Sequence, residues 1–193
     1  MSVYNAIKYD PINAGSLTLI STFTSDGSDA TADFTSGIDS TYKEYLFIIN
    51  NIHPETDGAN FLFQVDTGTN TSYNQTITST FFTAFHKEDD ATPGVEYTGG
   101  LDQAQGTAFQ NLNSSSGNGN DECSSGYLHM FNPASGTFVK HFMSRFGSYI
   151  ENDQMADLYV AGYFNTTTAL TRVQFKFNSG NIDTGDICLY GIN

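Results

Sequence analysis

The stretch 169–193, ALTRVQFKFNSGNIDTGDICLYGIN, decides the fold of this chain. Apolar and polar side chains alternate along VQFKF (173–177), which is the two-residue period of a half-buried strand. The breaker cluster SGN (179–181) follows, and the alternation resumes around ICL (187–189). A terminal strand needs partners for its backbone groups, so we expect these two strands to lie inside a sheet.

The same alternation recurs along most of the chain. The most apolar run, YKEYLFIINNI (42–52), is apolar on both faces, which predicts a central strand between two layers. Further strands are expected within 16–23, 30–34, 61–65, 73–85, 126–131, 138–146 and 157–164. About ten strands separated by turns predict an all-β chain, folded as an antiparallel jelly-roll-like β-sandwich.

The chain is expected to form one domain. Its 193 residues are enough to bury a core without disulfide or metal cross-links, and 16 Phe and 11 Tyr supply much of the apolar content. We predict a single sandwich over 16–193, preceded by an N-terminal arm over 1–15. The polar stretch 113–126 predicts a flexible surface loop. Cys123 and Cys188 form no metal or redox motif, so both are expected to be free thiols, with Cys188 in the core.

The N-terminal arm has two interpretations. Pro11 breaks any helix in this segment, and a frayed tail is one possibility. The other is an assembly arm that packs on a neighbouring chain. In that case the contact would be made by its large apolar side chains, Tyr4, Ile7, Tyr9 and Ile12.

The charge is strongly acidic, with 7 Lys and Arg against 21 Asp and Glu and a net charge of −14. Such a surface repels phosphate groups, which argues against nucleic-acid binding and against docking on anionic membranes. It favours either solubility or a positively charged partner. No apolar run approaches the ~18 residues of a membrane span, and the N-terminal segment does not resemble a signal peptide.

Candidate catalytic and metal-ligating residues are few. His129 and His141 lie on neighbouring predicted strands and could meet across the turn between them, but zinc needs further ligands at fixed spacing. Glu151 and Asp157 are the best carboxylate pair for a glycosidase, without a supporting motif. We therefore expect no catalytic residue, no cofactor and no metal, and we do not expect an enzyme.

Acidic loops at 26–29, 88–90 and 121–122 offer oxygen atoms that could bind calcium. None of them follows the D-x-D-x-D-G spacing of a calcium loop. Solvated loop charge is the alternative interpretation.

Three tyrosines are candidates for a binding or assembly surface. Tyr159 and Tyr163 fall on the same face of one predicted strand, and Tyr149 is close in sequence. Aromatic rings of this kind could line a groove for host glycans. They could equally belong to the sandwich core or to a subunit interface.

The C-terminal pattern S-G-N-I followed by G-x-I-x-L-Y-G-I resembles the closing hairpin of β-sandwich modules in structural proteins of tailed-bacteriophage virions. Three earlier segments are similar to the same modules: 30–68, 125–133 and 145–150. The resemblance therefore spans roughly 16–193. Its motifs are structural, and none of them is catalytic.

This resemblance implies a non-enzymatic structural protein on the outer surface of a phage virion, assembled in the host cytoplasm. The main expectation is a capsid decoration (cement) protein that forms a homo-oligomer, most simply a trimer, and contacts the major capsid or tail proteins. The alternative is a tail-fibre or tail-tip module that recognises host surface glycans. An enzyme that trims surface polysaccharide is a third and more distant interpretation.

Overall fold

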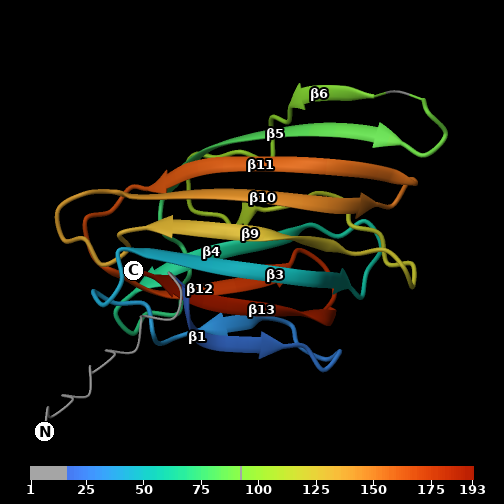
Figure 1. Ribbon diagram of the computed structural model, residues 1–193. Coiled ribbons are helices and arrows are strands. Elements are labelled where there is room, and N and C mark those ends of the chain that lie inside the picture. The colour runs from blue at the N-terminus through green and yellow to red at the C-terminus, as the bar shows by residue number, and fades with distance from the viewer. Residues whose placement is uncertain (1–16, 92) are drawn as a thin grey trace, which may run out of the picture.

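The computed structural model describes residues 17–91 and 93–193 and confirms the all-β sandwich (Figure 1). Thirteen strands form two antiparallel sheets, and these two segments contain no helix. The larger sheet contains, in spatial order, β1 (Leu17–Thr24), β13 (Ile182–Ile192), β3 (Glu44–Pro54), β9 (Ser124–Phe131), β10 (Lys140–Ile150), β11 (Gln154–Phe164), β5 (Ile77–Lys87) and β6 (Gly94–Tyr97), with β7 (Ala104–Gly106) also paired to β5. The smaller sheet contains β2 (Ala32–Phe34), β12 (Leu170–Phe177), β4 (Phe61–Thr67) and β8 (Gln110–Asn111).

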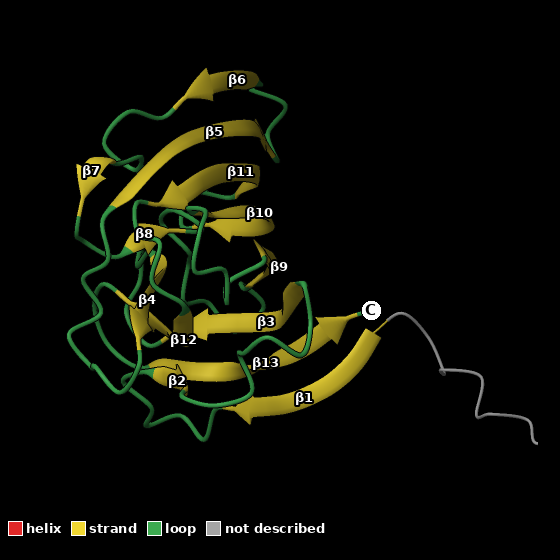
Figure 2. Cartoon of the chain, turned by 90° about the vertical axis from the view of Figure 1, so that its left-hand side faces the viewer, coloured by secondary structure: helices red, strands yellow, loops and turns green. Residues whose placement is uncertain are grey.

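The chain crosses repeatedly from one sheet to the other. β1 and β3 belong to the larger sheet and β2 and β4 to the smaller one, and β11, β12 and β13 alternate in the same way. As a result β13 pairs with β1 and β3, while β12 pairs with β2 and β4. Figure 2 shows β4, β8 and β12 as a layer beside β3, β9 and β10. This nested pairing produces the jelly-roll-like sandwich expected from the sequence.

The core between the sheets is built on phenylalanine. The ring centre of Phe175 on β12 lies 5.1 Å from that of Phe47 on β3 and 5.7 Å from that of Phe61 on β4. All three side chains are fully buried. Such aromatic pairs contribute about 0.5–1.5 kcal/mol each beyond the burial of their area. The buried residues of the two sheets form one continuous cluster, so the sandwich has a single core.

The two strands expected within 169–193 are present, but the expectation that they pair with each other as a closing hairpin is wrong. β12 and β13 are both strands, but they belong to different sheets, so the turn at 179–181 is a crossover. Gly180 has a φ of 70°, a conformation that glycine adopts without strain. The Ile182 N–H donates to the Asp29 carbonyl at 2.8 Å, which ties the crossover to a distant turn. Residue alternation did not distinguish these cases, because a hairpin and a crossover both require two strands and a turn.

β3 is covered on one face and open on the other. Tyr45, Phe47 and Ile49 are buried against the smaller sheet. Leu46 and Ile48 point to the opposite face and are half-buried among their neighbours, and no second layer of described strands covers them. The expectation of a strand between two layers is therefore wrong, and the apolar residues on its second face need another explanation.

The stretch 113–126 is packed into the fold on either side of an exposed middle at Asn118, Asn120 and Asp121, which corrects the expectation of a free surface loop. Asn113, Ser116 and Ser124 are fully buried. The Asn113 amide donates to the hydroxyls of Ser116 at 2.6 Å and Ser124 at 3.0 Å. The Ser124 hydroxyl lies 2.6 Å from that of Ser148 on β10. These mutual hydrogen bonds satisfy polar groups that would otherwise be costly to bury.

The two cysteines are free thiols, as expected. Cys188, however, lies half-buried on the side of the larger sheet that faces away from the core, where the Thr22 hydroxyl is 3.6 Å from its sulfur. The expectation of a core position for Cys188 is therefore wrong. Partial burial raises the pKa of the Cys123 thiol.

The N-terminal arm, 1–15, lies outside the described residues, and so do its four candidate contacts, Tyr4, Ile7, Tyr9 and Ile12. The described part of the chain starts with β1 at the edge of the larger sheet. Over 17–91 and 93–193, no helix has the length and apolar character needed to cross a bilayer.

Candidate binding face on the larger sheet

The larger sheet has a face that turns away from the core, toward the viewer in Figure 1. Strand alternation places every second residue of its central strands on this side. Several large apolar side chains there are exposed, including Phe82 at 41 %, Tyr127 at 39 % and Met143 at 54 %. We call this surface the outer face and define it by Tyr127, His129 and Phe131 of β9, His141, Met143, Arg145 and Tyr149 of β10, Met155, Asp157, Tyr159, Ala161 and Tyr163 of β11, Thr78, Thr80 and Phe82 of β5, and Tyr97 of β6.

A row of large side chains crosses the middle of the outer face. Strand register places five residues in line over β9, β10, β11, β5 and β6: Tyr127, Arg145, Tyr159, Phe82 and Tyr97. The rings of Tyr159 and Phe82 are parallel within 4°, with their centres 4.7 Å apart. From the β10 side, the guanidinium carbon of Arg145 lies 4.9 Å from the centre of the Tyr159 ring. Tyr159 is therefore packed between two neighbours and is not a free platform for stacking.

Arg145 and Asp157 form a two-pronged ion pair within this row. Arg145 Nε lies 2.9 Å from Asp157 Oδ1, and Nη2 lies 2.7 Å from Oδ2. The Tyr159 hydroxyl also donates to Asp157 Oδ2, at 2.9 Å. The hydrogen bond from Arg145 lowers the pKa of Asp157, and the hydrogen bond to that carboxylate raises the pKa of Tyr159. Asp157 therefore stays ionised and engaged, which suits a fixed binding surface better than a general acid.

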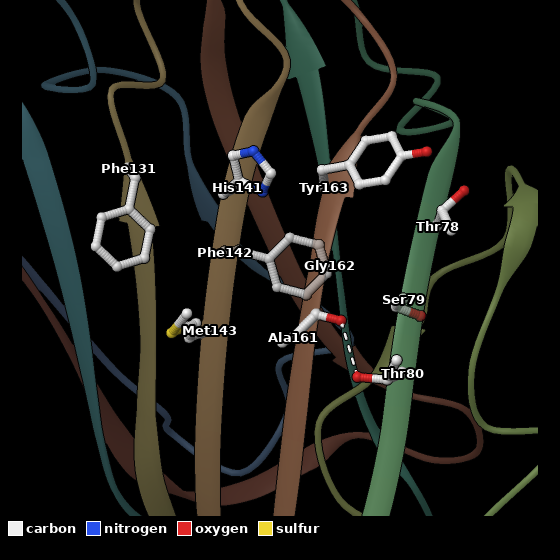
Figure 3. A pocket seen from close by; sticks show the side chains of 10 residues that line it. All are labelled: Thr78, Ser79, Thr80, Phe131, His141, Phe142, Met143, Ala161, Gly162 and Tyr163. Carbon is white, nitrogen blue, oxygen red and sulfur yellow. Dashed lines mark hydrogen bonds between the residues drawn. The ribbon is translucent and has the colours of Figure 1, made fainter.

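A shallow hollow of about 530 Å³ lies beside the row (Figure 3). Phe131, His141 and Tyr163 border it on one side, and Ala161 forms a low floor between larger neighbours. The Thr80 hydroxyl donates to the Ala161 carbonyl at 3.4 Å. Aromatic walls around a small residue can accept an apolar side chain or the face of a sugar ring.

The three tyrosines singled out in the sequence all lie on the outer face, but they do not form one groove. Tyr163 borders the hollow, and Tyr159 stands in the packed row. Tyr149 lies toward the other end of β10, where its hydroxyl donates to Asp153 at 3.1 Å. Partial burial and the Asp153 carboxylate raise the pKa of Tyr149 to about 12. Of the three rings, only that of Tyr163 borders the hollow.

Charge is distributed unevenly between the outer face and the ends of the sandwich. On the outward positions of β9, β10, β11 and β5, Arg145 and Asp157 balance each other. Loops that meet at one end of the sandwich, on the right in Figure 1, carry most of the carboxylates, around 26–29, 55–57, 88–90, 121–122 and 151–153. A protein surface can therefore approach the outer face without meeting the densest negative charge.

His129 and His141 do not meet, which corrects the expectation of a facing pair. Strand register pairs His129 with Met143. The His129 Nε2 atom lies 2.8 Å from a Glu44 carboxylate oxygen, and its ring centre is 4.1 Å from that of Phe131. Within the described residues, no three His, Cys, Asp or Glu side chains converge on a position where a metal ion could bind.

The two carboxylates considered for a glycosidase lie in different surroundings. Glu151 is in the turn between β10 and β11, in a polar hollow with Lys87 and Glu88. Asp157 borders a different hollow, next to Met155, and is held by its ion pair. The two groups therefore do not line one cleft as an acid and base pair would.

The acidic turns use their oxygen atoms in local hydrogen bonds. Asp26 accepts from the Ser28 N–H at 3.0 Å and from the Ser28 hydroxyl at 2.7 Å, and these bonds lower the pKa of Asp26. Glu122 accepts from the Gly119 N–H at 2.6 Å. The geometry therefore favours solvated turns, whose carboxylates accept hydrogen bonds from their own loop, over calcium sites.

Four members of the central row, Tyr127, Arg145, Phe82 and Tyr97, were missed by sequence reasoning. The signal that could have found them is the presence of large apolar residues on both faces of one strand, as in Phe81 next to Phe82. In 42–52 the same signal was attributed to burial between two layers. No protein-family model, no curated protein and no solved structure matches this chain, so its function is argued from the outer face itself.

Proposed function

We propose that this chain is a non-enzymatic structural protein that binds another protein through the outer face. The observation that carries the proposal is the exposed row of Tyr127, Arg145, Tyr159, Phe82 and Tyr97. Aromatic residues and Arg are enriched in the cores of protein interfaces. Tyr and Arg are also frequent among the few residues that dominate binding energy.

The row is already ordered in the free chain. Arg145 is held by two hydrogen bonds to Asp157, and Tyr159 is held by the same carboxylate and by the Phe82 ring. A partner would therefore not have to fix these flexible side chains on binding, which removes part of the entropic cost of association. A preorganised row of this kind suits a permanent structural contact.

The side of the larger sheet that carries the outer face is also large enough for a stable interface when the strands beyond the outer face, β3, β13 and β1, are included. Eight strands lie side by side from β1 to β6, and the long ones have 11 residues. With strands ~4.8 Å apart and ~3.3 Å per residue, the sheet covers on the order of 1,100 Å². A standard interface needs about 800 Å² from each partner.

We propose a tailed-phage virion as the setting, with the major capsid or tail proteins as partners and capsid decoration as the main role. This part rests on the resemblance of 16–193 to virion β-sandwich modules. The acidic loops at one end of the sandwich are consistent with a solvent-facing outer surface. The trimer stays a prediction that the mass of the purified protein would test.

The test is incorporation into particles of the phage that encodes the chain. We would compare the wild type with Phe82→Asp, which places a charge in the row, and with Phe138→Asp as a matched control. Phe138 is 70 % exposed in the connection between β9 and β10, outside the outer face. After gradient sedimentation, wild-type and Phe138→Asp chains should travel with the particles, and Phe82→Asp should stay in the soluble fraction.

Imaging of the same particles would then place the chain on the head or the tail. The proposal fails if Phe82→Asp is incorporated as well as the wild type while its folding is intact by circular dichroism. It also fails if the wild type never travels with particles. Density that shows the outer face bare in the assembled particle would have the same consequence.

Glycan recognition is a second candidate, favoured by the hollow next to Tyr163. No described residue makes a hydrogen bond with the Tyr163 hydroxyl, and His141 has its ring centre 6.0 Å from that of Tyr163. We expect Tyr163→Ala to abolish any binding to an array of bacterial surface polysaccharides, whereas Tyr149→Ala should retain it. An array without wild-type signal would remove this candidate.

A further inference from the structure

The two sheets end in five edge strands, and four of these are short. β6 has 4 residues, β2 and β7 have 3 each and β8 has 2, whereas β1 has 8. Short edges, charges and nearby prolines are the devices that stop sheets from pairing edge to edge. β6 carries Glu96 and follows Pro93, and β2 carries Asp33. These four edges are therefore protected, all of them by their short length and β6 and β2 by charge as well.

β1 is longer and lacks charge and proline, and its one irregularity is a register shift between Leu19 and Ser21 in its pairing with β13. Its sequence, LTLISTFT (17–24), contains no charge and no proline and is rich in β-branched and aromatic residues. One side of β1 pairs with β13, and among the described residues no strand or loop backbone pairs with its other side. Leu17 and Leu19 are 45 % and 55 % exposed. An uncharged edge of this length presents unpaired N–H and C=O groups to any strand that matches it.

We propose that β1 of a second copy of this chain pairs antiparallel with β1, joining the two larger sheets into one. Pairing over the full strand sets Leu17 opposite the partner's Thr24 and Leu19 opposite the partner's Thr22. The register of β1 with β13 puts Leu19 beside Tyr190 and Thr22 beside Cys188, both on the outward side of the sheet. Outward residues therefore meet outward residues, as a stable register requires.

Charge favours a second copy in this antiparallel orientation. The carboxylates nearest β1 lie at its C-terminal end, where Thr24 contacts Asp186 and Asp26 follows in the turn. Antiparallel pairing sets this acidic end beside the uncharged Leu17 end of the other copy, whereas parallel pairing would bring like charges together. The net charge of −14 on each copy opposes association at long range, and an uncharged strand keeps like charges out of the contact itself.

The resulting contact has two-fold symmetry and closes on itself, so it produces a dimer and not a filament. Both outer faces then lie on the same side of one continuous sheet. The inference goes beyond the proposed function and does not depend on it, because the edge of β1 is separate from the central row. A dimer also differs from the trimer expected from the sequence.

The test is the mass of the purified full chain by sedimentation over a series of concentrations. The wild type should approach twice the 21.1 kDa of one chain. Leu19→Glu, which places like charges near the two-fold axis, should raise the dimer dissociation constant by about tenfold or more. Val95→Glu is the matched control, because Val95 is 76 % exposed on β6 at the opposite edge, and it should dimerise like the wild type.

Hydrogen exchange is the second measurement. In the wild type, amides of 17–24 should exchange more slowly as the concentration rises, while those of 94–97 should not change. A wild type that stays at the mass of one chain, or reaches three times that mass, overturns the proposal. A Leu19→Glu variant that is folded and dimerises like the wild type also overturns it, as does protection that grows at β6 and not at β1.

Discussion

On the smaller sheet, the side chains that point away from the core are largely polar, and those on β4 are buried. On the larger sheet, the side chains that point away from the core are largely apolar and exposed. Gln64 and Asp66 of β4 are 0 % and 1 % exposed, while Phe82 and Tyr127 on the outer face are 41 % and 39 % exposed. The difference lies in what covers each face. The chain folds its own loops over β4, but no described segment covers the outer face.

The cover over β4 is tied down by hydrogen bonds. Gln64 Nε2 donates to the carbonyls of Gln75 at 3.0 Å and Ala108 at 3.0 Å. Asp66 accepts from the Tyr73 N–H at 2.9 Å. Polar side chains can be buried there because the loops supply fixed partners. The outer face has the opposite composition, which suits closure by another molecule.

The largest expected effect separates two neighbours on β5. Phe81 is fully buried and Phe82 is on the outer face. Phe81→Ala should lower the free energy of unfolding by about 3–5 kcal/mol, because it leaves a cavity in the core. Phe82→Ala should cost only about 1 kcal/mol, mainly the loss of stacking on Tyr159. Urea unfolding of the free protein measures both, and equal losses would show that the outer face is not open.

A second pair of variants compares register partners on the smaller sheet. Gln64 and Gln174 lie opposite each other on β4 and β12. Gln64→Leu removes a buried donor shared by several loop carbonyls, so it should cost about 2–4 kcal/mol of unfolding free energy. Gln174→Leu should cost no more than about 1 kcal/mol, because the side chain is half-exposed and loses a single hydrogen bond, to Asp33 at 2.8 Å. If both variants unfold like the wild type, the loops do not depend on Gln64.

The strands were largely predictable from the sequence because alternation reports burial on one side of a strand. Alternation along 73–85 and 173–177 puts Phe81 with Thr83, and Val173 with Phe175, on a shared face, and the structure buries all four. The direction of the chain after each turn was not predictable, since pairing depends on contacts between residues far apart in sequence. For that reason β12 and β13 were mistaken for a hairpin.

The candidate site was predictable only in part, for a related reason. Hydrophobicity cannot distinguish a face buried by its own chain from one left for a partner, so Leu46 and Ile48 suggested an inner layer. The reverse error occurred at Asn113 and Ser124, which are polar yet buried through mutual hydrogen bonds. For Tyr163 the sequence left a groove, the core and a subunit interface open, and the structure places it on the outer face with Tyr159, four positions earlier on the same strand.

Removing one tyrosine hydroxyl from each sheet compares the two faces on a smaller scale. The Tyr73 hydroxyl, over the smaller sheet, donates to Asp33 at 3.1 Å, and the residue is 5 % exposed. Tyr73→Phe should therefore cost about 1 kcal/mol of unfolding free energy. Tyr163→Phe on the outer face should change it by less than about 0.5 kcal/mol. A larger loss for Tyr163→Phe than for Tyr73→Phe would contradict the assignment of the two faces.

The smallest expected effect is a pH dependence on the outer face. Because Arg145 lowers the pKa of Asp157 below its ordinary 3.8, the ionised carboxylate stabilises the folded chain above that value. This contribution is lost as the pH falls through the lower, folded-state pKa. The urea midpoint of the wild type should exceed that of Asp157→Asn slightly at about pH 7, and the two should converge at about pH 2. Arg145→Met should remove most of this pH-dependent difference, because it removes the main cause of the shift. If the difference in urea midpoint between the wild type and Asp157→Asn persists undiminished in acid, Asp157 stabilises the fold through packing and not through its charge. The ion pair would then not order the row.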